Sequence, residues 1–110
     1  MTEKQFGKIN SVRIGKGGYQ DAMFGIWIDM GGKNWGAGTS IGGVWNTEPC
    51  SSSKWNEQDR LNEIGVMFNK LRILLMEAGV DSVNDLVSLP VECTFESMRL
   101  VGWRILTEVL

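Results

Sequence analysis

The sequence predicts a single-domain α+β protein in which an antiparallel sheet packs on one long amphipathic helix. Three observations support this fold class: stretches of alternating hydrophobicity separated by glycine pairs, one long stretch with helical periodicity, and alternation again near the end. The length of 110 residues suits one domain, placed at residues 1–110, and the 43% hydrophobic content suffices for a core. The expected element order is βββ, long α, short α, ββ.

A first strand is expected at residues 8–16, with one irregular step in it. Ile9 is out of phase with Ile14, so an extra residue must lie between them. A β-bulge near Asn10 and Ser11 accommodates that residue.

A second strand and a hairpin follow. Residues 22–30 show the most regular alternation in the chain, with Trp27 on the face opposite the apolar one. Gly31-Gly32 is expected to form a two-residue turn because glycine takes positive φ freely, and a third strand covers residues 33–41.

The middle of the chain combines a loop with the long helix. Residues 42–55 have the composition of a loop, and their length favours a functional or mobile one. A helix is expected at residues 57–78, with Asn56 as its N-cap and Gly79 as its C-terminal stop. Its apolar stripe has alternating spacings of three and four residues and comprises Leu61, Ile64, Phe68, Leu71, Leu75 and Ala78.

A second apolar stripe on this helix makes its hydrophobic arc wider than one sheet face requires; it comprises Met67, Ile73, Leu74 and Met76. We therefore expect a homodimer or a higher homo-oligomer, with Gly65 permitting close approach of a second subunit.

The last third of the chain returns to strands. Ser82 and Asp85 have the spacing of a capping box, which predicts a short helical turn. Residues 91–95 alternate as a strand, residues 96–98 form a turn, and residues 99–109 form the last strand.

Charge limits the classes of partner. The formal net charge is −2 and the isoelectric point is near 5.1, so we expect binding neither to duplex nucleic acid nor to a membrane. Residues 1–54 carry six Lys/Arg against four Asp/Glu, whereas the rest of the chain is acidic. An anionic ligand is therefore expected on the first half.

Cysteine and histidine usage limits the chemistry. Cys50 and Cys93 lack a metal or redox spacing and are read as reduced thiols, which favours the cytoplasm. The chain contains no histidine, the commonest general base and a frequent metal ligand. We therefore expect a protein that is not an enzyme, with no cofactor and no metal. An acid/base pair of Asp21 and Asp29 stays open, although Asp29 also reads simply as a surface charge.

Six residues are candidate ligand contacts. A glycine pair precedes three side chains with polar groups, and an aromatic ring near a lysine suits a stacked base. An arginine in the last strand serves either as an anion contact or as an edge-strand charge that blocks strand addition. The glycine-rich stretches lack the spacing of a phosphate-binding loop. The predicted ligand-binding residues are Tyr19, Gln20, Asp21, Lys33, Trp35 and Arg104.

Five segments carry a resemblance that spans nearly the whole chain: Gly17–Gly25, Gly32–Gly36, Lys54-Trp55, Val91–Phe95 and Trp103–Leu110. Together they resemble a family of small, functionally uncharacterised phage and prophage accessory proteins. The resemblance implies a viral or prophage origin and a place in the cytoplasm of the host cell. Cys93 and the turn at residues 96–98 depart from the family pattern, so these positions are poor candidates for function.

Two functions follow by analogy with small phage accessory proteins. In the first, a homo-oligomer counteracts host defence by binding and sequestering a nucleotide-like small molecule. In the second, the tryptophan-rich surface and the helix bind a host defence protein, as an anti-CRISPR inhibitor does, without any small-molecule ligand. Hydrolysis by a carboxylate pair and single-strand binding are the remaining alternatives, and the acidic charge disfavours the latter.

Overall fold

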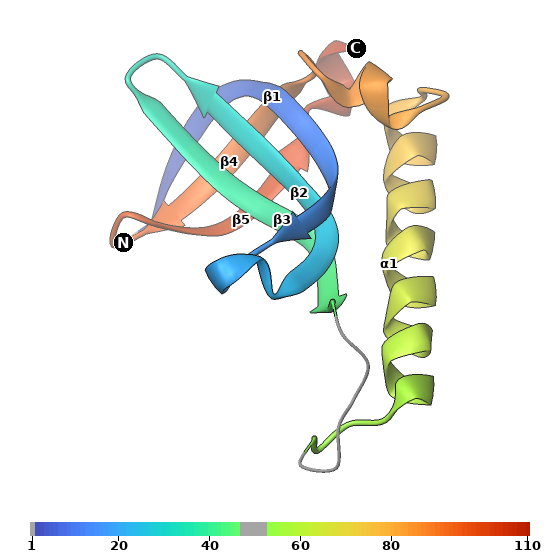
Figure 1. The fold of residues 1–110 in the computed structure, drawn as a ribbon. Coiled ribbons are helices and arrows are strands. Elements are labelled where there is room, and N and C mark those ends of the chain that lie inside the picture. Colours follow the sequence, from blue (N-terminus) through green and yellow to red (C-terminus); the bar gives the residue numbers. More distant parts are fainter. Residues whose placement is uncertain (1, 47–52) are drawn as a thin grey trace.

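The computed structural model describes residues 2–46 and 53–110, in which five strands form one antiparallel sheet beside one long helix (Figure 1). The expected mixed fold with an antiparallel sheet is confirmed. The strand order across the sheet is β3-β2-β1-β4-β5. In chain order the elements are β1 (Thr2–Gly17), η1 (Tyr19–Asp21), β2 (Met23–Gly32), β3 (Trp35–Trp45), α1 (Glu57–Ala78), η2 (Val83–Leu86), β4 (Pro90–Glu96), β5 (Arg99–Ile105) and η3 (Thr107–Val109).

β1 is the central strand, and different parts of it pair with two neighbouring strands. Its residues from Lys8 onward pair with β2, while its residues up to Lys8 pair with β4. The register against β2 shifts between Ile9 and Ser11, so Asn10 is the extra residue of a bulge, as predicted. The sheet therefore curls instead of lying flat, as Figure 1 shows.

The first half of β1 was absent from the prediction. Residues 2–6 are polar except for Phe6, and all are exposed, so they lack the apolar alternation that marks a strand. Their strand conformation comes from pairing with β4, from Thr2 opposite Glu96 to Lys8 opposite Pro90.

The turn between β2 and β3 lies two residues later than predicted. Gly31 and Gly32 remain in β2 and pair with Gly36 and Trp35, so the predicted Gly31-Gly32 turn is wrong. The turn residues are Lys33 and Asn34, and Asn34 supplies the positive φ of 66°. Gly32 is needed for space, because a Cβ there would lie 2.5 Å from Nε1 of the Trp35 indole.

The strand β3 continues through Trp45, beyond the predicted end at residue 41, so residues 42–45 of the predicted loop 42–55 belong to a strand. The part of that loop at residues 47–52, with Cys50, lies outside the described residues. β3 is an edge strand without a charged residue, whereas β5 at the opposite edge carries Arg99 and Arg104.

The long helix begins and ends as predicted. The Asn56 side chain accepts a hydrogen bond from the Asp59 amide at 2.8 Å, and the Asp59 carboxylate accepts one from the Asn56 amide at 3.3 Å. Gly79 ends the helix in the left-handed conformation, with φ 71°, and its amide donates to Leu75 and Met76.

The face that α1 buries differs from the expected stripe. Its buried residues are Met67, Leu71 and Ala78, whereas Leu61 and Phe68 are about half exposed at 50% and 47%. α1 packs against β3, and a Cβ placed on Gly42 would contact the Met67 side chain at 3.3 Å. The absence of a side chain at Gly42 thus seats the Met67 side of the helix on the sheet.

The core lies between the sheet and α1. Its buried hydrophobic residues are Ile9, Ile26, Ile28, Met30, Met67, Leu71, Ala78, Leu86, Val91, Cys93 and Ile105. The Cys93 thiol contacts the Met30 sulfur at 3.8 Å, and burial raises the pKa of this thiol. Cys93 therefore behaves as a small apolar side chain.

Two elements near the C-terminus differ from the prediction. The short helix after Ser82 has the predicted capping box with Asp85 but is a 3₁₀ helix, η2, not an α-helix. The last strand ends at Ile105 instead of residue 109, because its partner β4 begins at Pro90. The Leu106 amide donates to the Pro90 carbonyl at 2.9 Å, and Thr107–Val109 then form the 3₁₀ helix η3.

The C-cap of α1 gives a first test. Gly79→Ala should lower the free energy of unfolding by about 1–2 kcal/mol, because a Cβ is disfavoured at positive φ. Gly102→Ala is the matched control, since neither glycine has an atom within 4 Å of an added Cβ and only Gly79 has positive φ. Urea denaturation measures both, and equal effects would contradict the role of backbone conformation.

Candidate functional site

The outer face of β1, β2 and β3, opposite the core, carries a tryptophan in a fixed orientation. The Trp27 indole Nε1 donates a hydrogen bond to the Gly15 carbonyl at 2.9 Å. The ring lies over glycines: a Cβ on Gly17 would meet indole Cε2 at 2.5 Å, and one on Gly25 would meet Cζ2 at 3.2 Å. Trp27 is half-buried as a result.

Polar side chains surround this ring in a hollow of about 790 Å³, which we call the Trp27 hollow. Cross-strand pairing explains their proximity, because Arg13 and Ser40 both lie opposite Trp27 while Ser11 lies opposite Asp29. The hollow is lined by Ser11, Val12, Arg13, Gly18, Trp27, Asp29, Gly38, Thr39 and Ser40.

Hydrogen bonds within the chain hold two of these side chains. The Ser11 hydroxyl donates to the Asp29 carboxylate at 3.0 Å, and the Arg13 guanidinium donates to the Lys16 carbonyl at 2.7 Å. Arg13, Ser11 and Asp29 are all exposed, so their remaining hydrogen-bonding capacity is open to solvent.

The chemistry of the Trp27 hollow suits recognition of a flat ring. An indole with a fixed orientation offers a stacking surface, and such stacking tolerates any base. The carboxylate and hydroxyls provide acceptors and donors, and Arg13 provides a positive charge.

The predicted ligand-binding residues lie at three separate places instead of one. Tyr19, Gln20 and Asp21 form η1 before β2, while Lys33 and Trp35 lie after β2. A strand of ten residues separates these two groups, which is about 33 Å at the usual rise. The six residues therefore do not form one site within a single chain.

The η1 group is exposed, with Tyr19 at 85% of its maximum. Gln20 and Asp21 have φ near 55°, at 56° and 55°, so this segment is a tight turn that connects β1 to β2. Polar residues are common in such turns, so the turn itself accounts for the polar residues after Gly18 and no ligand is needed to explain them.

Trp35 has a packing role. Its ring meets the Phe95 ring edge-on, with centroids 5.6 Å apart and planes at 82°. It also lies against Gly7 and Gly32, although one side borders a hollow with Phe6 and Lys8.

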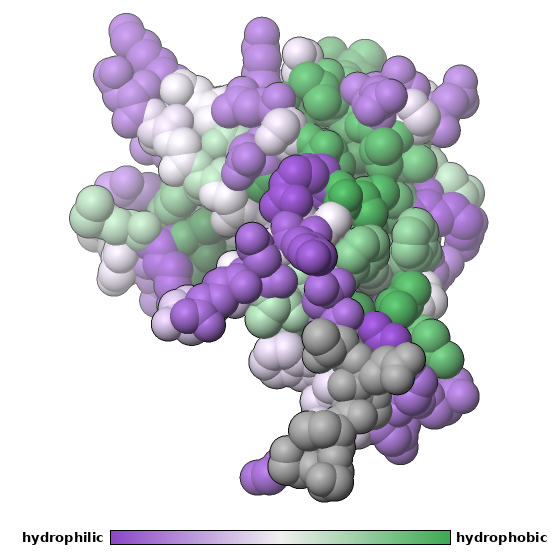
Figure 2. Space-filling view, in the orientation of Figure 1, coloured by the Kyte–Doolittle hydropathy of each residue, from purple (hydrophilic) through white to green (hydrophobic). Residues whose placement is uncertain are grey.

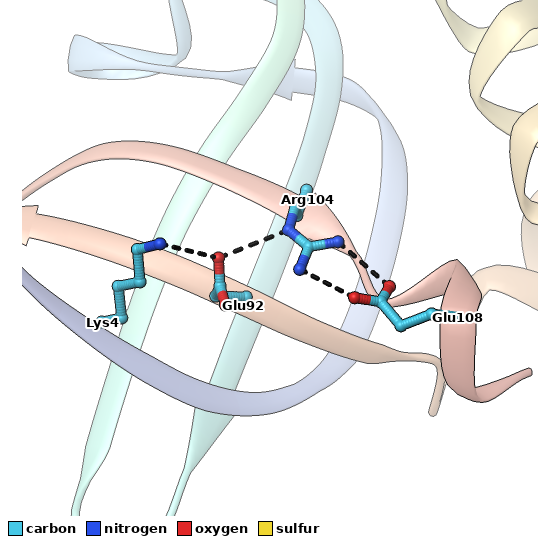
Figure 3. A network of polar contacts seen from close by, with 4 residues as sticks. All are labelled: Lys4, Glu92, Arg104 and Glu108. Carbon is cyan, nitrogen blue, oxygen red and sulfur yellow. Dashed lines mark hydrogen bonds and ion pairs between the residues drawn. The ribbon is translucent and has the colours of Figure 1, made fainter.

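Arg104 is engaged by two carboxylates. Its guanidinium makes two hydrogen bonds to Glu108, at 3.0 and 2.9 Å, and one to Glu92 at 3.3 Å. Glu92 also pairs with Lys4 at 3.7 Å, so it is shared by two cations (Figure 3). Hydrogen bonding to Glu108 is the main cause that raises the pKa of Arg104, and the bonds from Arg104 lower the pKa of Glu108. Because Arg104 lies on edge strand β5, its position accords with an edge-strand charge.

A smaller apolar cleft of about 250 Å³ lies where β2 and β3 meet the start of α1. Trp45, which is 48% exposed, and Trp55 line it beside Arg60. Arg60 connects α1 to β3, because its guanidinium donates to the Trp45 carbonyl of β3 at 3.3 Å and also pairs with Glu57 of α1 at 2.7 Å.

Sequence reasoning named Trp27 as a surface aromatic but missed Arg13, Ser11 and Ser40. The predicted bulge at Asn10 is the sequence feature that indicates Ser11 and Arg13. It places both on the face opposite Val12, and thus beside Trp27 and Asp29. The pairing register needed to join them to Ser40 is not visible in the sequence.

No family model matches the chain, and searches of curated proteins and of solved structures give no significant match either. Within residues 2–46 and 53–110, no group of three or more metal-ligating side chains is placed to hold an ion. No helix in this part of the chain has both the length and the apolar character needed to cross a membrane.

The glycine beneath Trp27 gives a second prediction. Gly17→Ala should displace the indole and lower the free energy of unfolding by about 1–3 kcal/mol, because the added Cβ overlaps the ring. Gly36→Ala is the control, since its nearest atom is the Met30 carbonyl oxygen at 3.8 Å. ¹⁹F NMR of protein labelled with fluorotryptophan should show the Trp27 signal shifted only in Gly17→Ala. An unshifted Trp27 signal there would show that the ring does not lie over this glycine.

The pair of Glu108 with Arg104 gives a third prediction, on pH. Because the pKa of Glu108 is lowered in the folded protein, the pair stabilises the fold above the ordinary carboxyl pKa. This contribution is lost as the pH falls through the lowered pKa. The stability difference between wild type and Glu108→Gln should therefore shrink in acid, as unfolding measured across pH would reveal. A difference independent of pH would contradict the pairing.

Proposed function

We propose that this protein is a non-catalytic binding protein that holds a nucleotide-like small molecule in the Trp27 hollow. The observation that carries the proposal is the orientation of Trp27, whose indole is fixed by the Gly15 carbonyl and lies over glycines. A ring held in this way is ready to stack on a ligand without losing further conformational freedom.

The neighbours of Trp27 define the ligand class. A base stacks on the indole. The Asp29 carboxylate accepts hydrogen bonds from sugar hydroxyls or base edges, and the hydroxyls of Ser11 and Ser40 both donate and accept them. Arg13 is the cation of the hollow and contacts a phosphate. Asp29 next to it disfavours a ligand of high negative charge, so a ligand with one or two phosphates suits the hollow best.

The biological role follows from the phage resemblance. In the role we propose, the protein sequesters a nucleotide-like signal of host defence, which requires no catalysis. The absence of histidine from the chain supports a binding role over an enzymatic one.

A mononucleotide panel tests the site. Trp27→Leu should weaken binding of the best mononucleotide by about 10- to 100-fold, because base stacking contributes about 1–3 kcal/mol. Titration calorimetry measures the dissociation constants, and circular dichroism verifies that the variant is folded. Asp29→Asn, which preserves shape, should change the preference among bases or sugars.

Trp35→Phe and Arg104→Gln are matched controls, since both residues lie away from the Trp27 hollow. Both variants should bind as wild type does. If either loses binding while Trp27→Leu retains it, the ligand belongs to the residues predicted from the sequence and the Trp27 assignment is wrong.

The second candidate function is inhibition of a host defence protein without a small molecule. The apolar cleft favours it, because Trp45 is 48% exposed there and lies with the half-buried Trp55 beside Arg60. Tryptophan and arginine are typical anchors of protein interfaces. Failure of wild type to bind any nucleotide, combined with a defence protein whose capture is lost in Trp45→Ala, would support this function over the first.

A further inference from the structure

Tyr19 carries an aromatic ring that the fold does not use. It is 85% exposed and lies outside the core, and its side chain makes no hydrogen bond or ring contact within residues 2–46 and 53–110. The tight turn explains the positive φ of Gln20 and Asp21, but such turns favour glycine, proline and short polar residues and not an aromatic ring. The turn therefore leaves the Tyr19 ring without a structural role.

Tyr19 lies at the rim of the Trp27 hollow. Gly18, the residue before it, lines the hollow, and a Cβ on Gly18 would lie 3.8 Å from Cη2 of the Trp27 indole. Because consecutive Cα atoms are about 3.8 Å apart, the Tyr19 Cα lies within about 10 Å of the indole. Figure 1 shows η1, in blue, projecting from the sheet on the side away from α1. In Figure 2 this projection is largely hydrophilic and hydrophobic residues gather instead along α1, so η1 is not part of a broad apolar interface.

The Trp27 hollow has room for more than one base. Its volume of about 790 Å³ lies in the upper part of the range of roughly 300–1,000 Å³ that small-molecule sites occupy. We infer that Tyr19 stacks on a second base at the Gly18 end of the hollow, so that the ligand is a dinucleotide, in which one phosphodiester joins two nucleosides. This inference rests on the proposed function and specifies the ligand class of the same hollow.

The charges in the hollow limit the ligand to this length. Arg13 is the one cation among the described residues that line the hollow, and a Cβ on Gly15 would lie 3.3 Å from its Nη1. The Gly15 carbonyl also accepts the hydrogen bond of the Trp27 indole, so the guanidinium lies next to the ring. A dinucleotide brings a single linking phosphate to Arg13, whereas each added nucleotide brings another phosphate for which the hollow has no cation. The net charge of −2 also disfavours a longer strand.

The two rings have complementary roles. Trp27 is fixed by its hydrogen bond and by the glycines beneath it. The exposed Tyr19 side chain rotates about two bonds, so it closes on a base whose neighbour is already stacked on Trp27. Stacking of this kind needs no base-specific hydrogen bond, and it should therefore add affinity for dinucleotides of any sequence.

Titration calorimetry with linear dinucleoside monophosphates and the matching mononucleotides tests the inference. Wild type should bind the best dinucleotide at least about tenfold more tightly than the mononucleotide, because one additional base stacks. Tyr19→Ala should remove this difference and leave the affinity for the mononucleotide unchanged, whereas Trp27→Leu should weaken binding of both ligands. Tyr19→Phe should bind as wild type does, because stacking needs the ring and not the hydroxyl. Phe6→Ala is the matched control, since Phe6 is also an exposed aromatic residue, at 63%, but does not line the hollow.

The outcomes separate this inference from the proposed function. Equal affinities of wild type for dinucleotide and mononucleotide, or equal effects of Tyr19→Ala and Phe6→Ala, would overturn the inference and leave the Trp27 assignment intact. A tetranucleotide that binds at least about tenfold more tightly than the dinucleotide would also overturn it, because the ligand would then be a longer single strand. Binding of neither ligand by wild type would overturn the proposed function itself. Circular dichroism verifies that each variant is folded.

Discussion

β1 pairs with β2 along its second half and with β4 along its first half, and the bulge at Asn10 lies close to the point where the two pairings meet. An extra residue on one strand bends it and increases the local twist, so the sheet curls at this point. The same extra residue sets which side chains of β1 face the core, since Ile9 points inward before the bulge and Ser11 points outward after it. Both the core and the Trp27 hollow therefore depend on one backbone irregularity.

Glycine shapes the outer face as much as the side chains do. Trp27 is fixed because Gly17 and Gly25 leave room beneath it, and the same absence of side chains at Gly42 lets Met67 approach β3. Glycine in a strand costs conformational entropy, so its repeated use here is consistent with close packing of rings and strands instead of weak strand formation.

Local signals in the sequence were sufficient for the elements whose determinants are local. The limits of α1 follow from Asn56 with Asp59 and from Gly79, all within a few residues of the helix ends. The turn after β2 was misplaced because two glycines favour a turn wherever they occur, whereas here they make room for Trp35 and Asn34 supplies the positive φ. The first half of β1 was missed because its partner, β4, lies at the other end of the chain.

The same distinction applies to the candidate site. The sequence indicated which residue types were available, and Trp27 was among them, but it grouped residues that β2 holds at opposite ends. Arg13 and Ser40 reach Trp27 only through cross-strand register, which pattern alone does not reveal. The buried face of α1 was misjudged for a similar reason, since the most regular apolar stripe is not the one that the sheet covers.

The pairing of Thr2 with Glu96 has a consequence for how the chain folds. The hairpins β2–β3 and β4–β5 join neighbouring segments, whereas the contact of β1 with β4 closes nearly the whole chain into a loop. Contacts of such long range form slowly, because the entropy of closure is lost before they stabilise anything. During synthesis β1 leaves the ribosome well before β4 exists, so the central strand acquires its second neighbour only after residues 90–96 have been made.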